Sequence, residues 1–160
     1  MERVNHILSH PVWRREMKSI ELLEKERIFC GHGLSHLLDV GRIAYIYCLE
    51  EGIGLSKELV YAAALLHDIG RGREYTEGTP HEKAGAELAE IILKDTGFSG
   101  EEQNLILSAI LSHRRNSTEE RNILGEILYM ADKKSRCCFM CSAEKECNWK
   151  EERKNKTIER

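Results

Sequence analysis

Apolar residues recur at helical spacing along most of the chain, and short polar or glycine-containing stretches interrupt them. Residues suited to N-caps or first helical turns precede most of the apolar segments; they are Pro11, Ser56, Thr79, Pro80, Ser99 and Thr118. The pattern predicts six helices, at about residues 11–27, 34–51, 57–68, 80–95, 100–113 and 119–136. Residues 71–79 are mostly polar and predict a connecting loop. We therefore expect an all-α fold, a single compact bundle of about six helices.

The composition agrees with one helical domain. The chain has 160 residues, 41% of them apolar and 32% charged, with only two Pro and little Val. Its formal net charge of −3 gives no strong nucleic-acid signal. The apolar run at residues 59–66 is far shorter than the roughly 20 residues of a membrane span. Because the first residues form no secretory signal either, we expect a cytoplasmic protein without a membrane partner.

The end of the chain differs in composition from the rest. After Cys147 the residues are mostly charged, and the two signs alternate. Such a segment is typical of a solvated helix or a frayed end. We therefore divide the chain into a helical domain at residues 1–136 and a Cys-containing, highly charged C-terminal segment at residues 137–160.

Histidines and aspartates stand in otherwise apolar surroundings near several predicted helix ends. His67 and Asp68 end one apolar helix, His113 ends another, and Asp132 lies late in the last. A His-Asp pair taken alone is more often a capped helix end than a ligand pair. Carboxylates, however, are rarely buried unless they are paired or bound to metal. Imidazoles combined with carboxylates suit Zn, Fe, Mn or Ni, so the set indicates a buried metal site.

These residues resemble the HD superfamily of metal-dependent phosphohydrolases. The motifs run in order through residues 31–40, 63–70, 80–86, 109–113 and 130–133, so the resemblance covers about residues 32–136. It implies one divalent ion held by His36, His67, Asp68 and Asp132. It also implies a second ion held by His81 and His113, with Asp68 bridging the two. Small two-metal members such as the HD-type diadenosine tetraphosphate hydrolases are similar, and the sequence does not distinguish Fe, Mn, Zn and Ni.

The resemblance implies hydrolysis of a phosphate ester or anhydride, in a small-molecule phosphate or nucleotide substrate, by metal-activated water. Asp68 is then the catalytic residue. Candidate substrate contacts are Arg71, Arg73, Lys83, Arg114, Lys133 and His32. The family often has Lys where this chain has Arg71, which leaves the substrate open. His32 has three equal interpretations: an outer-sphere partner, an acid for the leaving group, or a cap for the following helix.

Two other functions are compatible with the same ligand set. Related folds with a di-iron centre perform oxygenation, and a non-catalytic nucleotide-sensing module could keep the metal for structure. Iron content with oxygen uptake separates the first from a hydrolase, and phosphate release separates the second. The sequence leaves the oligomeric state open.

Four of the six cysteines lie close together in the sequence. Cys138, Cys141 and Cys147 follow Cys137, and the first two have the C-x2-C spacing. A structural zinc site or an iron–sulfur cluster needs four ligands, usually from more than one loop. Metal binding at Cys138, Cys141 and Cys147, free thiols and redox control therefore all stay open. Cys30 and Cys48 stand among apolar residues and are predicted to lie in the core.

Overall fold

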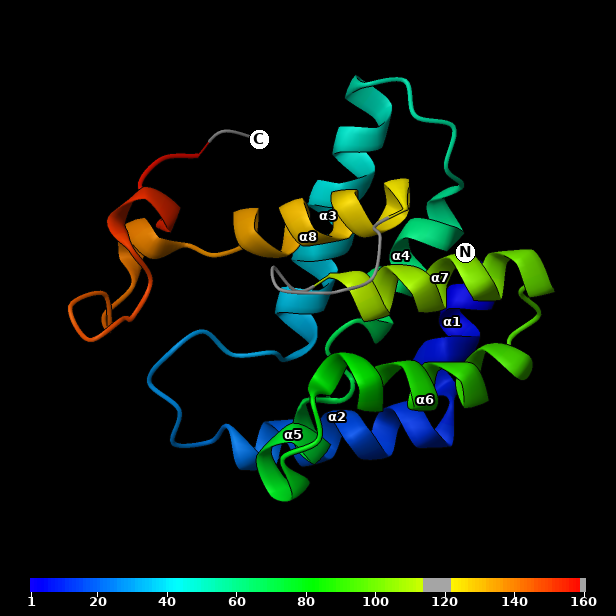
Figure 1. Ribbon diagram of the computed structural model, residues 1–160, viewed down its shortest axis with the longest axis horizontal. Helices are drawn as coiled ribbons and strands as arrows, with labels where there is room; N and C mark the ends of the chain where they lie inside the picture. Colours follow the sequence, from blue (N-terminus) through cyan, green and yellow to red (C-terminus); the bar gives the residue numbers. More distant parts are fainter. Residues whose placement is uncertain (114–121, 159–160) are drawn as a thin grey trace.

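The computed structural model describes residues 1–113 and 122–158, and this part of the chain is helical without strands (Figure 1). Eight α-helices are present in the described residues. They are α1 (Glu2–Ser9), α2 (Pro11–Leu23), α3 (Leu34–Glu50), α4 (Lys57–Leu66), α5 (Arg71–Glu77), α6 (His81–Lys94), α7 (Gly100–Ser112) and α8 (Ile123–Lys134). The predicted all-α fold is confirmed.

Helix α4 forms the centre of the core. Every residue from Leu59 to Leu66 except Tyr61 is buried, and α4 packs against α1, α3, α6, α7 and α8. Its three consecutive alanines allow close approach, and a Cβ on Gly41 of α3 would meet Tyr61 and Ala64 at 3.2–3.4 Å. Trp13 of α2 donates from Nε1 to the Leu65 carbonyl at 3.0 Å, which fixes α2 against the end of α4. The chain leaving α4 is therefore held on several sides.

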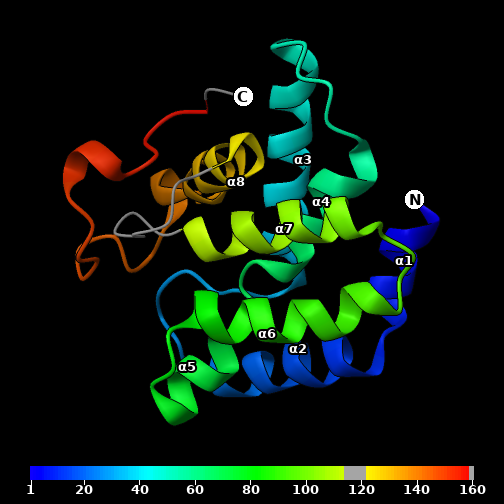
Figure 2. The ribbon, with the colours of Figure 1, turned by 45° about the vertical axis from the view of Figure 1, so that its right-hand side comes forward.

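The remaining helices surround this centre. Helix α8 packs on α3 and α7, and all three pack on α4. Helix α6 packs on α7 and on the short α5, which also contacts α2 (Figure 1). After α8 the chain leaves the bundle on the side where the loop of residues 24–33 also lies, as Figures 1 and 2 both show. Two segments far apart in sequence thus come to the same side of the molecule.

Two helices were not predicted. Helix α1 buries Val4 and Ile7, but eight residues hold too few turns for the pattern to stand out. Helix α5 occupies most of the stretch predicted as a loop. It was missed because its sequence is polar and only Gly72 is buried. It ends at Gly78, whose φ of 74° favours glycine. Packing against α2 and α6 stabilises α5 as a helix, although its own sequence gives only a weak helical pattern.

The predicted N-caps had different outcomes. The Ser56 side chain accepts from Leu59 N–H, and Ser99 forms a capping box with Glu102, as predicted. The predicted Thr79 cap is wrong, because the extended Pro80 is the N-cap of α6 and makes no side-chain cap. Thr118 lies outside the described residues; within them, α8 begins at Ile123 with Asn122 as its N-cap.

The C-terminal segment contains no α-helix in its described part, so of the two expected forms, a solvated helix or a frayed end, the helix is wrong. Two short 3-10 turns, Cys138–Met140 and Glu151–Arg153, are its only helical elements up to residue 158. Asn155 fastens it to the end of α8 by donating to the carbonyls of Lys133 at 2.6 Å and Arg136 at 2.8 Å. The segment therefore folds back on the bundle.

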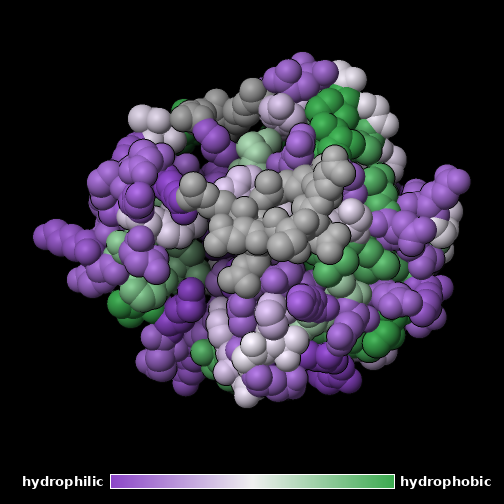
Figure 3. Space-filling model, viewed as in Figure 1, coloured by the Kyte–Doolittle hydropathy of each residue, from purple (hydrophilic) through white to green (hydrophobic). Residues whose placement is uncertain are grey.

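The described helices include none with both the length and the apolarity of a membrane span. Hydrophilic side chains cover most of the face shown in Figure 3.

Candidate metal centre

The ends of five helices bring six potential ligands together in the interior. His36 lies in the first turn of α3, and His67 and Asp68 directly follow α4. His81 begins α6, His113 directly follows α7, and Asp132 lies near the end of α8. All six side chains are buried. We call them the His/Asp cluster.

Each histidine of the cluster uses its Nδ1 for an outer hydrogen bond. The partners are the Ala64 carbonyl for His67 (2.8 Å), the Ile110 carbonyl for His113 (2.5 Å), Glu74 for His81 (2.9 Å) and Ser135 Oγ for His36 (3.1 Å). A carbonyl or carboxylate accepts only, so Nδ1 of those rings carries the proton. The Nε2 atoms of His67, His81 and His113 then face the cluster without a proton, which is the usual arrangement of metal-binding histidines.

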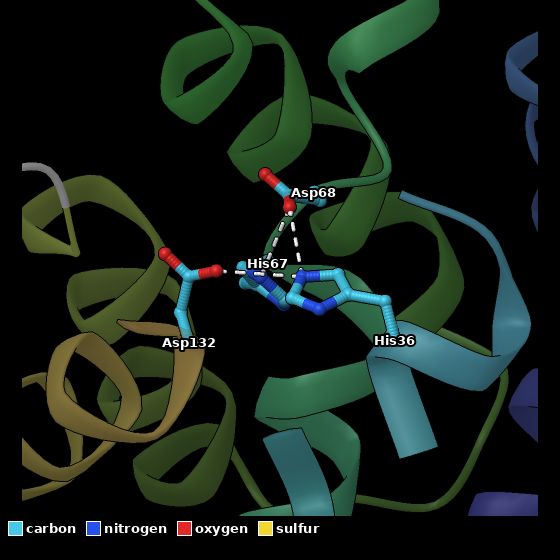
Figure 4. Close-up of side chains that lie close together, drawn as sticks. All are labelled: His36, His67, Asp68 and Asp132. Atoms are coloured by element: carbon cyan, nitrogen blue, oxygen red, sulfur yellow. Dashed lines mark ion pairs between the residues drawn. The ribbon is translucent and has the colours of Figure 1, made fainter. Parts of the chain in front are cut away.

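The first group of ligand atoms surrounds one oxygen of Asp68. Asp68 Oδ2 lies 3.1 Å from His67 Nε2 and 3.5 Å from His36 Nε2, and His36 Nε2 lies 3.4 Å from Asp132 Oδ1 (Figure 4). One atom from each of these four residues lies within 4.8 Å of every other. This group contains the four residues predicted to hold the first ion.

The second group surrounds the other oxygen of Asp68. Asp68 Oδ1 lies 3.5 Å from His81 Nε2 and 3.8 Å from His113 Nε2, and the two Nε2 atoms are 3.1 Å apart. These three ligand atoms also lie within 4.8 Å of one another. Asp68 is therefore common to both groups, with one oxygen directed to each.

The chemistry of the cluster fits divalent metal. Among the described residues, His67 Nε2 and Asp68 Oδ2 are buried polar atoms without a hydrogen-bond partner. Such atoms are costly to bury unless something compensates them. Four imidazoles and two carboxylates are a donor set for Fe, Mn, Zn or Ni, and both groups offer at least three donors.

The protonation states differ between residues of the cluster. Burial acts to lower the pKa of His36, but its hydrogen bonds to Asp132 and Asp68 raise it. Burial acts to raise the pKa of Asp68, but the charges of His67 and Arg71 outweigh it and hold that pKa well below its usual range. Burial likewise opposes ionisation of Asp132, and hydrogen bonding to His36 brings its pKa well below the usual value. Burial, together with the charge of Arg71, lowers the pKa of His81 to about 4. Both carboxylates are therefore ionised near neutral pH, and His81 is neutral.

His32 lies beside the cluster and is tied to residues that the sequence did not single out. Its Nδ1 lies 2.5 Å from Glu24 Oε1, which also accepts from the Tyr75 hydroxyl at 2.6 Å. Its Nε2 lies 4.0 Å from Asp68 Oδ2. Gly33 is the N-cap of α3 and no side-chain cap is made, so the interpretation of His32 as a helix cap is wrong.

Arg136 is a contact of the cluster that sequence reasoning missed. Its Nη2 donates to His36 Nε2 at 3.0 Å and to Asp132 Oδ1 at 3.3 Å. An ion held by His36 Nε2 would require this guanidinium to give up the first hydrogen bond. The available signal was its position four residues after Asp132, which places both on one face of a helix.

The predicted substrate contacts do not all reach the cluster. Arg71 and Lys133 line a cleft of about 990 Å³ that His32, His81, His113 and Asp132 also line. Arg71 donates to Asp68 Oδ1 at 2.9 Å, and the Lys133 ammonium lies 2.5 Å from Asp132 Oδ2. Arg73 instead pairs with Glu87 at 3.3 Å, and neither it nor the exposed Lys83 lines the cleft. Arg114 lies outside the described residues.

The HD domain family matches residues 33–137 of this chain, a range that contains all six residues of the cluster. The chain belongs to the HD domain family. HD domains bind divalent metals, and the paired ligand groups around Asp68 agree with that property. The family therefore supports a metal-dependent hydrolase.

Relatives of this HD domain differ in length. A Clostridium beijerinckii protein, described as uncharacterized, is 42% identical over 97% of both chains. A predicted HD superfamily hydrolase from an uncultured Thermotogales bacterium, known from its crystal structure, superposes with a TM-score of 0.63 at 27% identity, over 88% of this chain and 80% of that one. Ribonuclease Y of Acetivibrio thermocellus is 29% identical over 71% of this chain, which corresponds to only 20% of that enzyme's length.

Proposed function

We propose that this HD domain is a metal-dependent phosphohydrolase that acts on a phosphate ester or anhydride of a small nucleotide. The observation that carries the proposal is the position of Asp68, whose two oxygens face different pairs of histidines. A carboxylate so placed can hold two divalent ions side by side. The reaction would be that of a phosphomonoesterase, a phosphodiesterase or a nucleotide pyrophosphohydrolase.

Two bound ions would lower the pKa of a shared water and offset charge on the phosphoryl group. The chain's own residues place the donors for this chemistry. The outer hydrogen bonds of the four histidines fix their rings, and Arg71 restrains Asp68. Rings held in this way need little reorganisation when the substrate arrives.

The charges that line the cleft favour the binding of an anionic substrate. Among the described residues that line it, Arg and Lys outnumber Asp and Glu by eight to three. Positive clefts attract phosphates, and guanidinium groups bind them in a bidentate manner. Tyr129 and Trp149 line the same cleft and supply aromatic faces for a nucleobase. The similarity to Ribonuclease Y agrees with a phosphodiester among the candidate bonds.

His32 is the candidate for proton transfer. The ionised Glu24 accepts its Nδ1–H, which leaves Nε2 as the atom that takes up and returns a proton beside Asp68. Burial lowers the pKa of His32, so the ring is neutral near neutral pH. We propose that Glu24 and Tyr75 act as positioning residues for this imidazole.

The test is phosphate release from a panel of nucleotide monoesters, diesters and anhydrides by metal-loaded protein. Asp68→Asn keeps the shape of the side chain but removes the charge, so we expect turnover to fall by about 1,000-fold, or about 4 kcal/mol of transition-state stabilisation. Asp68→Ala should abolish it. The control is Asp39→Asn, a residue of α3 whose side chain is 49% exposed and pairs with Arg42.

Equal turnover by Asp68→Asn and wild type would contradict the proposal. So would substrate-dependent oxygen uptake by iron-loaded protein without phosphate release, because this would identify an oxygenase. Tight nucleotide binding without turnover under every metal would instead identify a sensing module.

A further inference from the structure

A second set of potential metal ligands lies in the wall of the cleft. Cys138, Cys141 and Cys147 belong to the C-terminal segment, and Cys30 belongs to the loop between α2 and α3. All four line the same cleft, whereas Cys137 is exposed and does not. Cys138 is buried and the other three are half-buried. The prediction that Cys30 is a core residue is therefore wrong, whereas Cys48 is buried as predicted.

The local backbone suits thiol ligands. Residues Cys138–Met140 form a 3-10 turn in which Cys141 N–H donates to the Cys138 carbonyl at 3.2 Å. A tight turn between the two cysteines of a C-x2-C pair is what structural zinc sites require. A second turn, in which Cys147 N–H donates to the Glu144 carbonyl at 3.3 Å, ends at the third cysteine, which lines the cleft with this pair.

The fourth thiol comes from the other segment. Arg136 donates from Nη1 to the Gly31 carbonyl at 2.7 Å, which fastens the loop next to Cys30 to the start of the C-terminal segment. Figures 1 and 2 both show this loop and the segment on the same side of the molecule. Burial raises the pKa of the Cys30 thiol; Arg136 opposes this, and the thiols of Cys141, Cys138 and Cys147 add to the rise. The three thiols of the segment are thus near enough to Cys30 to act on the charge of its thiolate.

We propose that Cys30, Cys138, Cys141 and Cys147 bind one structural Zn²⁺ as thiolates, with release of the thiol protons. Four thiolates from two separate segments make a closed tetrahedral zinc site. Among the described residues, no three of these sulfur atoms all lie within 4.8 Å of one another. Zinc would therefore have to draw together the three thiols of the segment as well as Cys30 of the loop, which is feasible because neither stretch belongs to an α-helix.

A metal site would supply stability that the C-terminal segment does not gain from apolar packing. In its described part only Cys138 and Ala143 are buried apolar residues, so it has almost no core of its own. Small elements of this kind gain their stability from metal or disulfides. The zinc would hold Trp149 and Lys154 in place as part of the cleft wall, without contributing to the His/Asp cluster.

Cobalt substitution in the full chain tests the site. Co²⁺ bound to thiolates gives sulfur-to-metal charge-transfer bands in the near ultraviolet, which His and Asp ligands do not produce. We expect these bands to reach the intensity of one thiolate-bound Co²⁺ per chain once the His/Asp cluster is also filled, and to be lost in Cys30→Ser and Cys138→Ser. They should persist in Cys137→Ser and in Asp68→Asn. Absence of the bands in wild type, their persistence in Cys30→Ser, or an iron–sulfur spectrum in the purified protein would overturn the proposal.

A second measurement uses wild type alone, in case the serine variants fail to fold. Thiol alkylation followed by mass spectrometry is compared with and without added Zn²⁺. We expect zinc to protect Cys30, Cys138, Cys141 and Cys147 together while Cys137 stays reactive. Equal labelling in both states, or a disulfide between any of the four in protein kept under reducing conditions, would overturn the assignment.

Discussion

At Gly70, two residues after Asp68, the chain passes directly against the start of α6. A Cβ at this position would meet the His81 carbonyl oxygen at 2.2 Å and the Gly85 nitrogen at 2.4 Å. Both are backbone atoms, so only movement of a helix could make room. The glycine is required by this close approach and not by its φ of −79°.

Gly70→Ala should therefore push α6 away and carry His81 with it. We expect a loss of about 3 kcal/mol or more in the free energy of unfolding, together with weaker binding of one of the two ions. Urea unfolding and metal analysis of the purified variant measure the two effects. Gly54→Ala is the matched control, because no atom lies within 4 Å of its would-be Cβ. Equal stability of the two variants would show that α6 tolerates the shift.

Glu24 gives a pH-dependent prediction at the same scale. Burial acts to raise its pKa, but hydrogen bonds from His32 and Tyr75 lower it from 4.5 to about 2. A carboxyl group with a lowered folded-state pKa stabilises the fold fully above its unfolded pKa, and this contribution is lost as the pH falls toward the folded value. The window is therefore from about 4.5 down to about 2.

Glu24→Gln should be less stable than wild type by about 1–2 kcal/mol near neutral pH, after allowance for solvent screening. The difference should narrow as the pH is lowered from about 4.5 toward about 2, because the wild-type carboxylate loses its advantage there. Urea unfolding at a series of pH values measures it. The exposed neighbour Glu26→Gln serves as control, and a gap that stays constant with pH would rule out the ionised carboxylate as its cause.

At the scale of the elements, helix ends do most to position the cluster. Asn122 caps α8, the helix that carries Asp132: its side-chain oxygen accepts from Gly125 N–H at 2.8 Å, and its Nδ2 donates to the Leu105 carbonyl of α7 at 3.1 Å. One side chain thus both begins α8 and fastens it to α7.

Asn122→Ala should lower the free energy of unfolding by about 1–2 kcal/mol, because the cap and the contact with α7 are both lost. Asn122→Asp keeps the cap acceptor and removes only the Nδ2 donor, so it should lose less. Thermal unfolding followed by circular dichroism compares the three proteins. If Asp and Ala variants were equally unstable, the contact with α7 and not the cap would account for the effect.

At the scale of the whole molecule, the His/Asp cluster links α3, α6, α7, α8 and the end of α4. An ion that binds only the folded chain stabilises it by mass action, about 2.7 kcal/mol when its concentration is 100 times the dissociation constant. Chelation should therefore lower the melting temperature by several degrees, and added metal should restore it.

The control separates this cluster from the cysteine site. In His67→Ala, which lacks a central ligand, chelation should lower the melting temperature by less than in wild type. Differential scanning calorimetry, with the metal content measured in each sample, gives both values. A wild-type melting temperature that does not change after complete metal removal would speak against a metal-stabilised cluster.

The local pattern of apolar and polar residues was enough to predict the positions of most helices. Helices such as α3 and α7 carry apolar residues at helical spacing and end in recognisable caps or glycines, so their positions were predicted to within about one residue. Helix α5 was missed because its sequence is polar and only packing against α2 and α6 holds it. The residues of the His/Asp cluster were found because each lies within a short motif of the family, in a stretch that the sequence marks as buried.

The partners of the cluster were decided by the tertiary structure. Arg136 meets Gly31 and His36 across about 100 residues of chain, and Tyr75 meets Glu24 across 51. Cys30 lines the same cleft as three cysteines more than 100 residues later. Periodicity, capping and motif spacing depend on residues within a few turns of one another. Contacts between distant loops depend instead on how the helices pack. The local pattern describes each segment separately and therefore does not predict these contacts.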